Sequence, residues 1–167
     1  MRLTVGFLFQ PKWTALIHDE WMRNILLNRP DLTRAQLERT RQLMDQWGGD
    51  WDAGEFESLI PSLTLPDIDD RHVLAAAIAS KTPTIVTFNL SDFPHRALAP
   101  HNVRAISPDV FLLELLEDAP EAFLTAIRSH RTALKNPPCT SEAYLARLVD
   151  NRLRRTATRL EAYKQEI

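Results

Sequence analysis

The sequence is poor in the residues that build several common scaffolds and sites. Of its 167 residues, one is cysteine and four are glycine. The lone cysteine, Cys139, cannot form an internal disulfide, which excludes a secreted disulfide scaffold and favours a reducing, cytoplasmic compartment. Four glycines provide no glycine-rich phosphate loop, and neither paired cysteines nor a His-Glu-x-x-His motif is present to bind zinc.

The chain also lacks a long hydrophobic run. The apolar stretch 3–9 is interrupted by Thr4 and Gly6 and ends without a small-residue cleavage site, so it is too short for a membrane span and a poor signal peptide. We therefore expect no contact with a membrane. Hydrophobic residues make up 44% and charged residues 25% of the chain, which is typical of one ordinary domain with at most a small appendage.

Net charge is small because two oppositely charged segments cancel. The formal charge of −2 argues against a protein that coats nucleic acid generally. Residues 45–70, however, contain eight acids and no lysine or arginine, whereas residues 141–167 contain six basic residues and four acids. The basic segment either guides a nucleic-acid backbone or is the solvated face of a helix.

Capping signals and hydrophobic spacing predict the secondary structure. A short strand is expected over residues 7–13, an extended stretch over 56–65, and strands over 84–88 and 103–106. Helices are expected over residues 14–28, from Thr33 with a capping box and hydrophobic staple, over 73–79, from Ser107, from Asp118, and from Ser141 to near the end as a single amphipathic helix.

The central pair of elements indicates the fold class. Residues 73–79 are apolar at every position, so this helix must be covered on several sides, and the β-branched run that follows is typical of a buried parallel strand. A helix followed by a buried strand predicts an α/β architecture. We expect an α/β body over residues 1–116 and a helical C-terminal extension over residues 117–167.

Carboxylates are the residues on which chemistry could rest. Asp67, Asp69 and Asp70 crowd the start of the apolar helix, where one acid would cap free N–H groups but three would repel one another. Solvent, a raised pKa or a divalent cation would relieve that repulsion. Asn89 and Asp92 follow the buried strand, at the sheet edge where ligands bind in open parallel sheets.

A third acid completes a candidate metal site. By helical spacing, the carboxylate of Glu20 borders the buried face of the first helix. An oxygen cluster of Glu20, Asp70 and Asp92, with Asn89 as a neutral helper, would favour Mg²⁺ or Mn²⁺ over zinc. Such a site polarises a phosphodiester and lowers the pKa of an attacking water.

Two motifs give the chain a resemblance to a known family. They are Asp67-Ile-Asp-Asp-Arg-His-Val-Leu-Ala-Ala-Ala-Ile-Ala79 and Ile85-Val-Thr-Phe-Asn-Leu-Ser-Asp-Phe-Pro94. The chain resembles the PIN-domain ribonucleases, and among them the VapC-like toxins of toxin–antitoxin modules. The first motif is similar to the family's acid at the head of an alanine-rich helix, and the second to its strand and Thr-x-Asn/Asp-x-x-Asp-Phe turn. Residues 11–21 are similar to the stretch that supplies another acid.

The resemblance implies a fold, an activity and partners. It implies a PIN-like three-layer sandwich, with a short parallel sheet flanked by helices. The implied activity is cytoplasmic, metal-dependent hydrolysis of RNA by a metal-activated water, blocked by a cognate antitoxin, in a homodimer. Carried over by position, Glu20, Asp70 and Asp92 would hold Mg²⁺ or Mn²⁺, and Asn89 and Thr87 would shape the site, with Asp69 the competing assignment for Asp70.

The beginning of the chain departs from the family pattern. The family starts with a central strand that ends in its first acid, whereas the first acid here is Asp19 and residues 1–10 align with the end of the helix that follows that strand. A late start codon, a truncated gene, or a strand from another chain would each explain this. Besides a ribonuclease, the sequence therefore leaves open a non-catalytic PIN-like module that binds an antitoxin or RNA, and a phosphatase or flap-type DNA nuclease.

Overall fold

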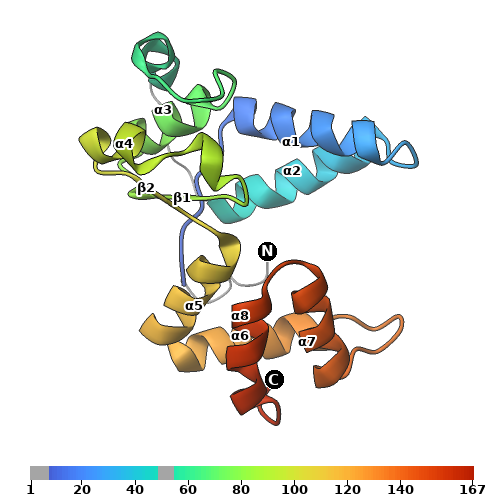
Figure 1. Cartoon of the computed structure of the whole chain (residues 1–167). Coiled ribbons are helices and arrows are strands. Elements are labelled where there is room, and N and C mark those ends of the chain that lie inside the picture. Colours follow the sequence, from blue (N-terminus) through green and yellow to red (C-terminus); the bar gives the residue numbers. More distant parts are fainter. Residues whose placement is uncertain (1–7, 49–54) are drawn as a thin grey trace. The chain divides into compact units, whose positions relative to one another are not determined.

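The computed structural model describes residues 8–48 and 55–167, which form two compact units. One unit comprises residues 10–48, 55–85 and 89–105, and we call it the acidic unit. The other comprises residues 8–9, 86–88 and 106–167, and we call it the helical unit. Figure 1 shows the elements of each unit. The expected alignment of residues 1–10 falls largely on residues outside this description.

The acidic unit contains short strands and several helices. Its elements are α1 (Ala15–Asn28), α2 (Arg34–Gly48), the 3₁₀ helix η2 (Phe56–Ser62), α3 (Arg71–Ala79), β1 (Thr84–Val86), η3 (Leu90–Asp92), α4 (His95–Leu98), η4 (Ala99–His101) and β2 (Arg104–Ile106), the last residue of each strand falling in the helical unit. The helical unit contains α5 (Pro108–Asp118), α6 (Pro120–Thr132), α7 (Ser141–Asp150), α8 (Arg154–Leu160) and η5 (Glu161–Tyr163).

The two strands form a small parallel sheet. Arg104 donates its backbone N–H to the carbonyl of Pro83 at 2.8 Å, and Thr87 donates to Ile106 at 3.0 Å. Together with the many helices, this sheet confirms the predicted α/β class. Residues 8–14 form no strand, contrary to the prediction for 7–13, because Pro11 lacks the N–H that a strand ladder needs.

Helix α3 is the centre of the acidic unit's core. Its residues Leu74 to Ala77 are buried, as its all-apolar sequence predicts. Phe56 and Leu63 from η2 pack in the same core. The predicted extended stretch over 56–65 is wrong because Phe56, Leu59, Ile60 and Leu63 recur at helical rather than alternating spacing, so a helical turn places all four against the core.

Helices α1 and α2 begin at the predicted caps. Thr14 accepts a hydrogen bond from the N–H of Ile17 at 3.1 Å. At α2, the N–H of Thr33 donates to the side chain of Gln36 at 2.8 Å, and the N–H of Gln36 donates back at 3.4 Å. These contacts confirm the capping box.

A buried histidine joins α1 to α2. His18 is fully buried and accepts a hydrogen bond at Nδ1 from the indole N–H of Trp21 at 2.9 Å. The proton therefore lies on Nε2, which donates to Asp45 of α2 at 2.9 Å. Both ring nitrogens of His18 are thus hydrogen-bonded, and the side chain links the two helices.

Replacing this histidine tests the link. We expect His18→Phe to lower the free energy of unfolding by about 1–3 kcal/mol, because the partly buried indole N–H of Trp21 and the carboxylate of Asp45 lose their partner. Asp45→Asn keeps an oxygen acceptor and should have a much smaller effect. Urea unfolding followed by circular dichroism measures both variants, and equal losses would contradict the assignment.

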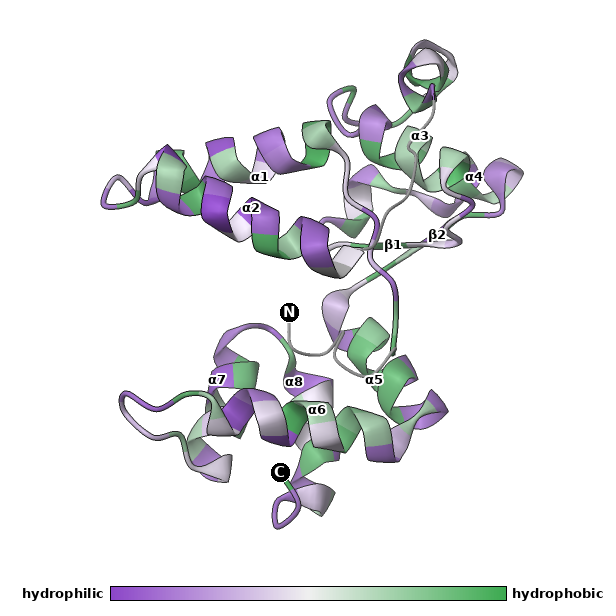
Figure 2. Ribbon diagram, turned by 180° about the vertical axis from the view of Figure 1, so that it is seen from behind, coloured by the Kyte–Doolittle hydropathy of each residue, from purple (hydrophilic) through white to green (hydrophobic). Residues whose placement is uncertain are grey.

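The helical unit has a separate core. Phe123, Ile127 and Leu160 are its most deeply buried large side chains, and Figure 2 shows α5 as hydrophobic over most of its length. Helix α5 packs with α6 and α8 in this core, and its cap at Ser107 is as predicted. The division of the chain after residue 116 stays a prediction. No helix among residues 8–48 and 55–167 is both long and apolar enough to cross a membrane.

The last predicted helix is divided in two. Helix α7 ends at Asp150, and Arg152 adopts a left-handed φ of 66° before α8 starts. The prediction of one continuous helix is wrong because Asp109, at the start of α5, accepts hydrogen bonds from the first N–H groups of α8. Helix α6 begins after Ala119 without a side-chain cap, so the predicted cap at Asp118 is also wrong.

Candidate functional site

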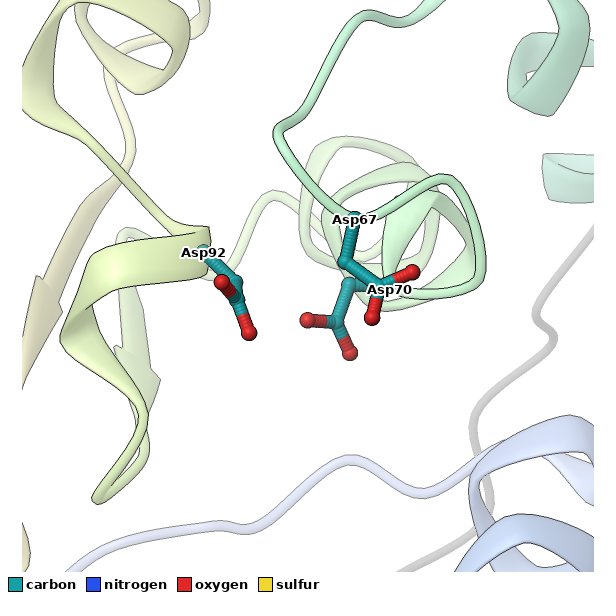
Figure 3. A group of neighbouring side chains, drawn as sticks. All are labelled: Asp67, Asp70 and Asp92. Atoms are coloured by element: carbon teal, nitrogen blue, oxygen red, sulfur yellow. The ribbon is translucent and has the colours of Figure 1, made fainter.

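Three aspartates of the acidic unit converge at one place. Asp67, Asp70 and Asp92 each offer a carboxylate oxygen, and these oxygens lie within 4.8 Å of one another. Figure 3 shows the side chains of Asp67 and Asp70 on one side and that of Asp92 pointing toward them from the other. Two come from the loop before α3 and one from the end of η3, just after β1.

A local turn places the first two aspartates together. The carboxylate of Asp67 accepts a hydrogen bond from the N–H of Asp69 at 2.8 Å, which is an Asx turn. Asp70 occupies the N-cap position of α3, yet its side chain makes no capping hydrogen bond there. Helix capping therefore does not explain this residue, whose carboxylate lies with Asp67 and Asp92. Asp69 is exposed and is not in the group.

A polar turn orients the third aspartate. The side-chain amide of Asn89 donates to Asp92, and Ser91 donates its hydroxyl to the amide oxygen of Asn89 at 2.9 Å. This arrangement fixes the amide of Asn89, because its oxygen accepts while its nitrogen faces the carboxylate. Asn89 thus holds Asp92 in place; its predicted role as a neutral helper at a metal stays a prediction.

Glu20 lies near the group and is held by a histidine. Its carboxylate is 3.1 Å from Nε2 of His72, which joins α1 to α3. The imidazole is only 12% exposed, whereas Glu20 is partly exposed. Sequence reasoning missed His72, and the only available signal was its position two residues after Asp70.

Thr87 belongs to the helical unit, where its N–H donates to the carbonyl of Ile106.

The electrostatics of the group are unfavourable without a counter-charge. Burial raises the pKa of Asp70 to about 6, and the negative charges of Glu20, Asp67, Asp92 and Asp69 add to the shift. Glu20 makes the largest of these charge contributions, so it lies close enough to act on the pKa of Asp70. The raised pKa of Asp70 agrees with the repulsion expected among the crowded acids, although burial is its largest cause.

The donor set fits a hard divalent cation. Carboxylate oxygens from Asp67, Asp70 and Asp92 are the ligands that Mg²⁺ and Mn²⁺ prefer, and neither cysteine nor histidine is in the group. A dication would also reverse the repulsion that raises the pKa of Asp70. Of the predicted ligands Glu20, Asp70 and Asp92, the structure brings Asp70 and Asp92 together and adds Asp67, whose Asx turn helical spacing could not show. The assignment of Glu20 as a ligand stays a prediction.

Comparison with known proteins agrees with the family resemblance. Residues 108–162 match the family model of the VapC50 C-terminal domain. Over 76 residues, the chain is 43% identical to a protein of Mycobacterium tuberculosis named "Putative ribonuclease VapC50"; the alignment covers 46% of this chain and 45% of that protein. The chain thus matches less than half the length of this relative. No solved structure matches significantly. The resemblance to the VapC-like toxins is confirmed.

Proposed function

We propose that this chain, as a relative of the VapC-like toxins, is a metal-dependent endoribonuclease that hydrolyses RNA phosphodiesters. The convergence of Asp67, Asp70 and Asp92 is the observation that carries the proposal, because the three carboxylates suit a divalent cation and repel one another without it. The name of the M. tuberculosis relative supports the same activity.

The residues divide into ligands and supporting groups. Asp70 and Asp92 would hold Mg²⁺ or Mn²⁺, with Asp67 beside them and Glu20 as the fourth acid. When bound, the cation polarises the phosphodiester and lowers the pKa of a water molecule. Asn89 orients Asp92, and His72 holds Glu20 by its Nε2. The family resemblance would also give Thr87, the residue that follows β1, a role in shaping the site.

The wider assignments follow from the family. We propose a PIN-like sandwich over residues 1–116, a helical extension over residues 117–167, a cytoplasmic location, a cognate antitoxin that blocks the acidic site, and a homodimer. Confirmed similarity to VapC-like toxins supports the antitoxin and the RNA substrate.

Cleavage of RNA by the full chain tests the function. With Mg²⁺ or Mn²⁺ we expect cleavage of single-stranded RNA or tRNA, no cleavage with EDTA, and little cleavage of DNA. Asp92→Asn should lower the rate at least about 100-fold, because the amide removes a negative ligand from the group.

A matched exposed acid gives the control. Asp118→Asn lies in the helical unit and should cleave like the unmodified chain. Equal cleavage by unmodified chain and Asp92→Asn would show that the site is wrong. Binding of RNA with no metal-dependent turnover would instead favour the non-catalytic binding module, and preferential cleavage of DNA would favour a flap-type nuclease.

A further inference from the structure

We infer that the helical unit carries a binding surface for single-stranded RNA, formed by Phe88 and the arginines around the α7–α8 turn. The inference takes RNA as the ligand from the proposed function and adds the residues that would bind the strand. The binding surface is defined by Phe88, Arg152, Arg154 and Arg155.

An exposed aromatic ring is paired with a guanidinium. Phe88 is 44% exposed, and the guanidinium carbon of Arg152 lies 4.6 Å from its ring centroid. Arg152 lies in the turn between α7 and α8, with a left-handed φ of 66°. Val86, two residues before Phe88 along the strand direction, is 41% exposed. Such a cluster of apolar surface and a planar cation on the outside is unusual for side chains that serve only the core.

The turn is also strongly basic. Residues 147–159 contain five arginines and one acid, Asp150. All five are exposed, at positions 147, 152, 154, 155 and 159. Within the part of the chain that the structure describes, no ion pair engages any of them. The charge of Arg155 acts on the carboxylate of Asp109. The other four exposed arginines are available to bind phosphates.

The combination favours an unpaired nucleic-acid strand over other anionic partners. Bases of a single strand stack on exposed aromatic rings and guanidinium planes, while arginines bind the backbone. An acidic protein would use the arginines alone and would not require a planar ring. Phe88 also leads directly into Asn89, the residue that orients Asp92. The binding surface and the acidic site are therefore joined by continuous chain.

Binding of a fluorescently labelled 12-nucleotide single-stranded RNA tests the inference. Fluorescence anisotropy is measured on the full chain in EDTA, so cleavage does not enter the result. We expect Phe88→Ala to weaken binding between about 5- and 150-fold and Phe88→Tyr to restore it, since base stacking is lost and regained. Arg152→Gln and Arg154→Gln should each reduce the slope of log affinity against log salt by about 0.7.

Control variants separate the surface from general charge. Arg39→Gln removes an exposed arginine of α2, in the acidic unit, and should leave the affinity within about twofold. The inference is overturned if the unmodified chain does not bind the RNA at low salt, or if Phe88→Ala and Arg152→Gln bind as well as it does. Displacement of the RNA by polyglutamate with equal potency from the unmodified chain and Phe88→Ala would also overturn it, since charge alone would then explain binding.

The result is independent of the nuclease assignment. RNA binding that depends on Phe88, without metal-dependent cleavage, would contradict the proposed function and keep the surface. Cleavage that depends on Asp92, with RNA binding that is unchanged in Phe88→Ala, would keep the proposed function and contradict the surface.

Discussion

Replacing Asp109 with alanine is expected to lower the free energy of unfolding of the helical unit by about 3 kcal/mol. Asp109 is buried, and its two carboxylate oxygens accept from the N–H of Arg155 at 2.9 Å and the N–H of Thr156 at 2.8 Å. The hydroxyl of Thr156, which is fully buried, donates to the same carboxylate at 2.7 Å. Alanine would leave the two N–H groups without this acceptor, whereas the hydroxyl of Thr156 also lies 3.1 Å from the backbone carbonyl of residue 109, which alanine keeps. Each buried unsatisfied group costs about 1–3 kcal/mol.

The pH dependence of stability gives a second signature of this carboxylate. Burial raises the pKa of Asp109, but the hydrogen bonds from Thr156 and Arg155 outweigh it, so the net pKa lies below the usual value. A carboxyl group with a lowered folded-state pKa stabilises the fold above its unfolded pKa, near 4, and loses this contribution as the pH falls through the folded value. The unmodified chain should therefore lose stability below about pH 4, and Asp109→Ala should lose less over that range.

Urea unfolding at pH 7 and at pH 3 checks both effects. Asp118→Ala removes an exposed acid from the other end of the same helix and serves as the control, with an expected change within about 0.5 kcal/mol. The free energy of unfolding of Asp109→Asn should lie between those of Asp109→Ala and Asp118→Ala, because the amide oxygen of asparagine retains one acceptor. Equal stability of the two alanine variants would show that Asp109 does not hold the start of α8.

Local chemistry predicted the helix starts, whereas long-range contacts decided the breaks. The caps at Thr14, Thr33 and Ser107 are visible in the sequence because each residue binds an N–H three positions away. The cap of α8 is supplied by Asp109, 46 residues earlier than Arg155. No local pattern contains this partner, so the break between α7 and α8 could not be predicted.

Local sequence pattern predicted one part of the candidate site and missed the other. Asp70 and Asp92 each stand beside a strongly patterned element, α3 and β1, so their side of the core follows from the pattern. Asp67 enters the group through an Asx turn, and His72 meets Glu20 across 52 positions of sequence. These contacts depend on side-chain geometry and on the packing of α1 against α3. Periodicity carries no information about either.

Asp70→Asn is expected to stabilise the metal-free protein and to abolish its response to metal. Burial and the surrounding carboxylates raise the pKa of Asp70 from 3.8 to about 6. A raised folded-state pKa means that the ionised carboxylate opposes folding, so the unmodified chain should lose stability as the pH rises from about 4 to above 6. The shift corresponds to at most about 3 kcal/mol, which partial exposure reduces to about 1–2 kcal/mol.

Metal is expected to reverse the order of stability of the unmodified chain and Asp70→Asn. At a Mn²⁺ concentration 100 times its Kd, binding should stabilise the unmodified chain by about 2.7 kcal/mol. Asp70→Asn should gain much less and should cleave RNA at least about 100-fold more slowly, because the group loses one charged ligand. The variant should therefore melt higher in EDTA and lower in Mn²⁺, both at pH 7.5.

The neighbouring aspartate makes the comparison specific. Asp69→Asn changes the same loop, but its side chain is exposed and lies outside the group of three, so it should retain the Mn²⁺ response and cleavage. Its effect on metal-free stability should be smaller than that of Asp70→Asn, since Asp69 is the last of the causes that raise the pKa of Asp70. If Asp70→Asn melts below the unmodified chain in EDTA, the carboxylate stabilises the fold and repulsion does not govern this group. If it keeps the full Mn²⁺ response, the cation binds elsewhere. Only the opposite changes in EDTA and Mn²⁺ identify a carboxylate that is retained for metal at the expense of stability.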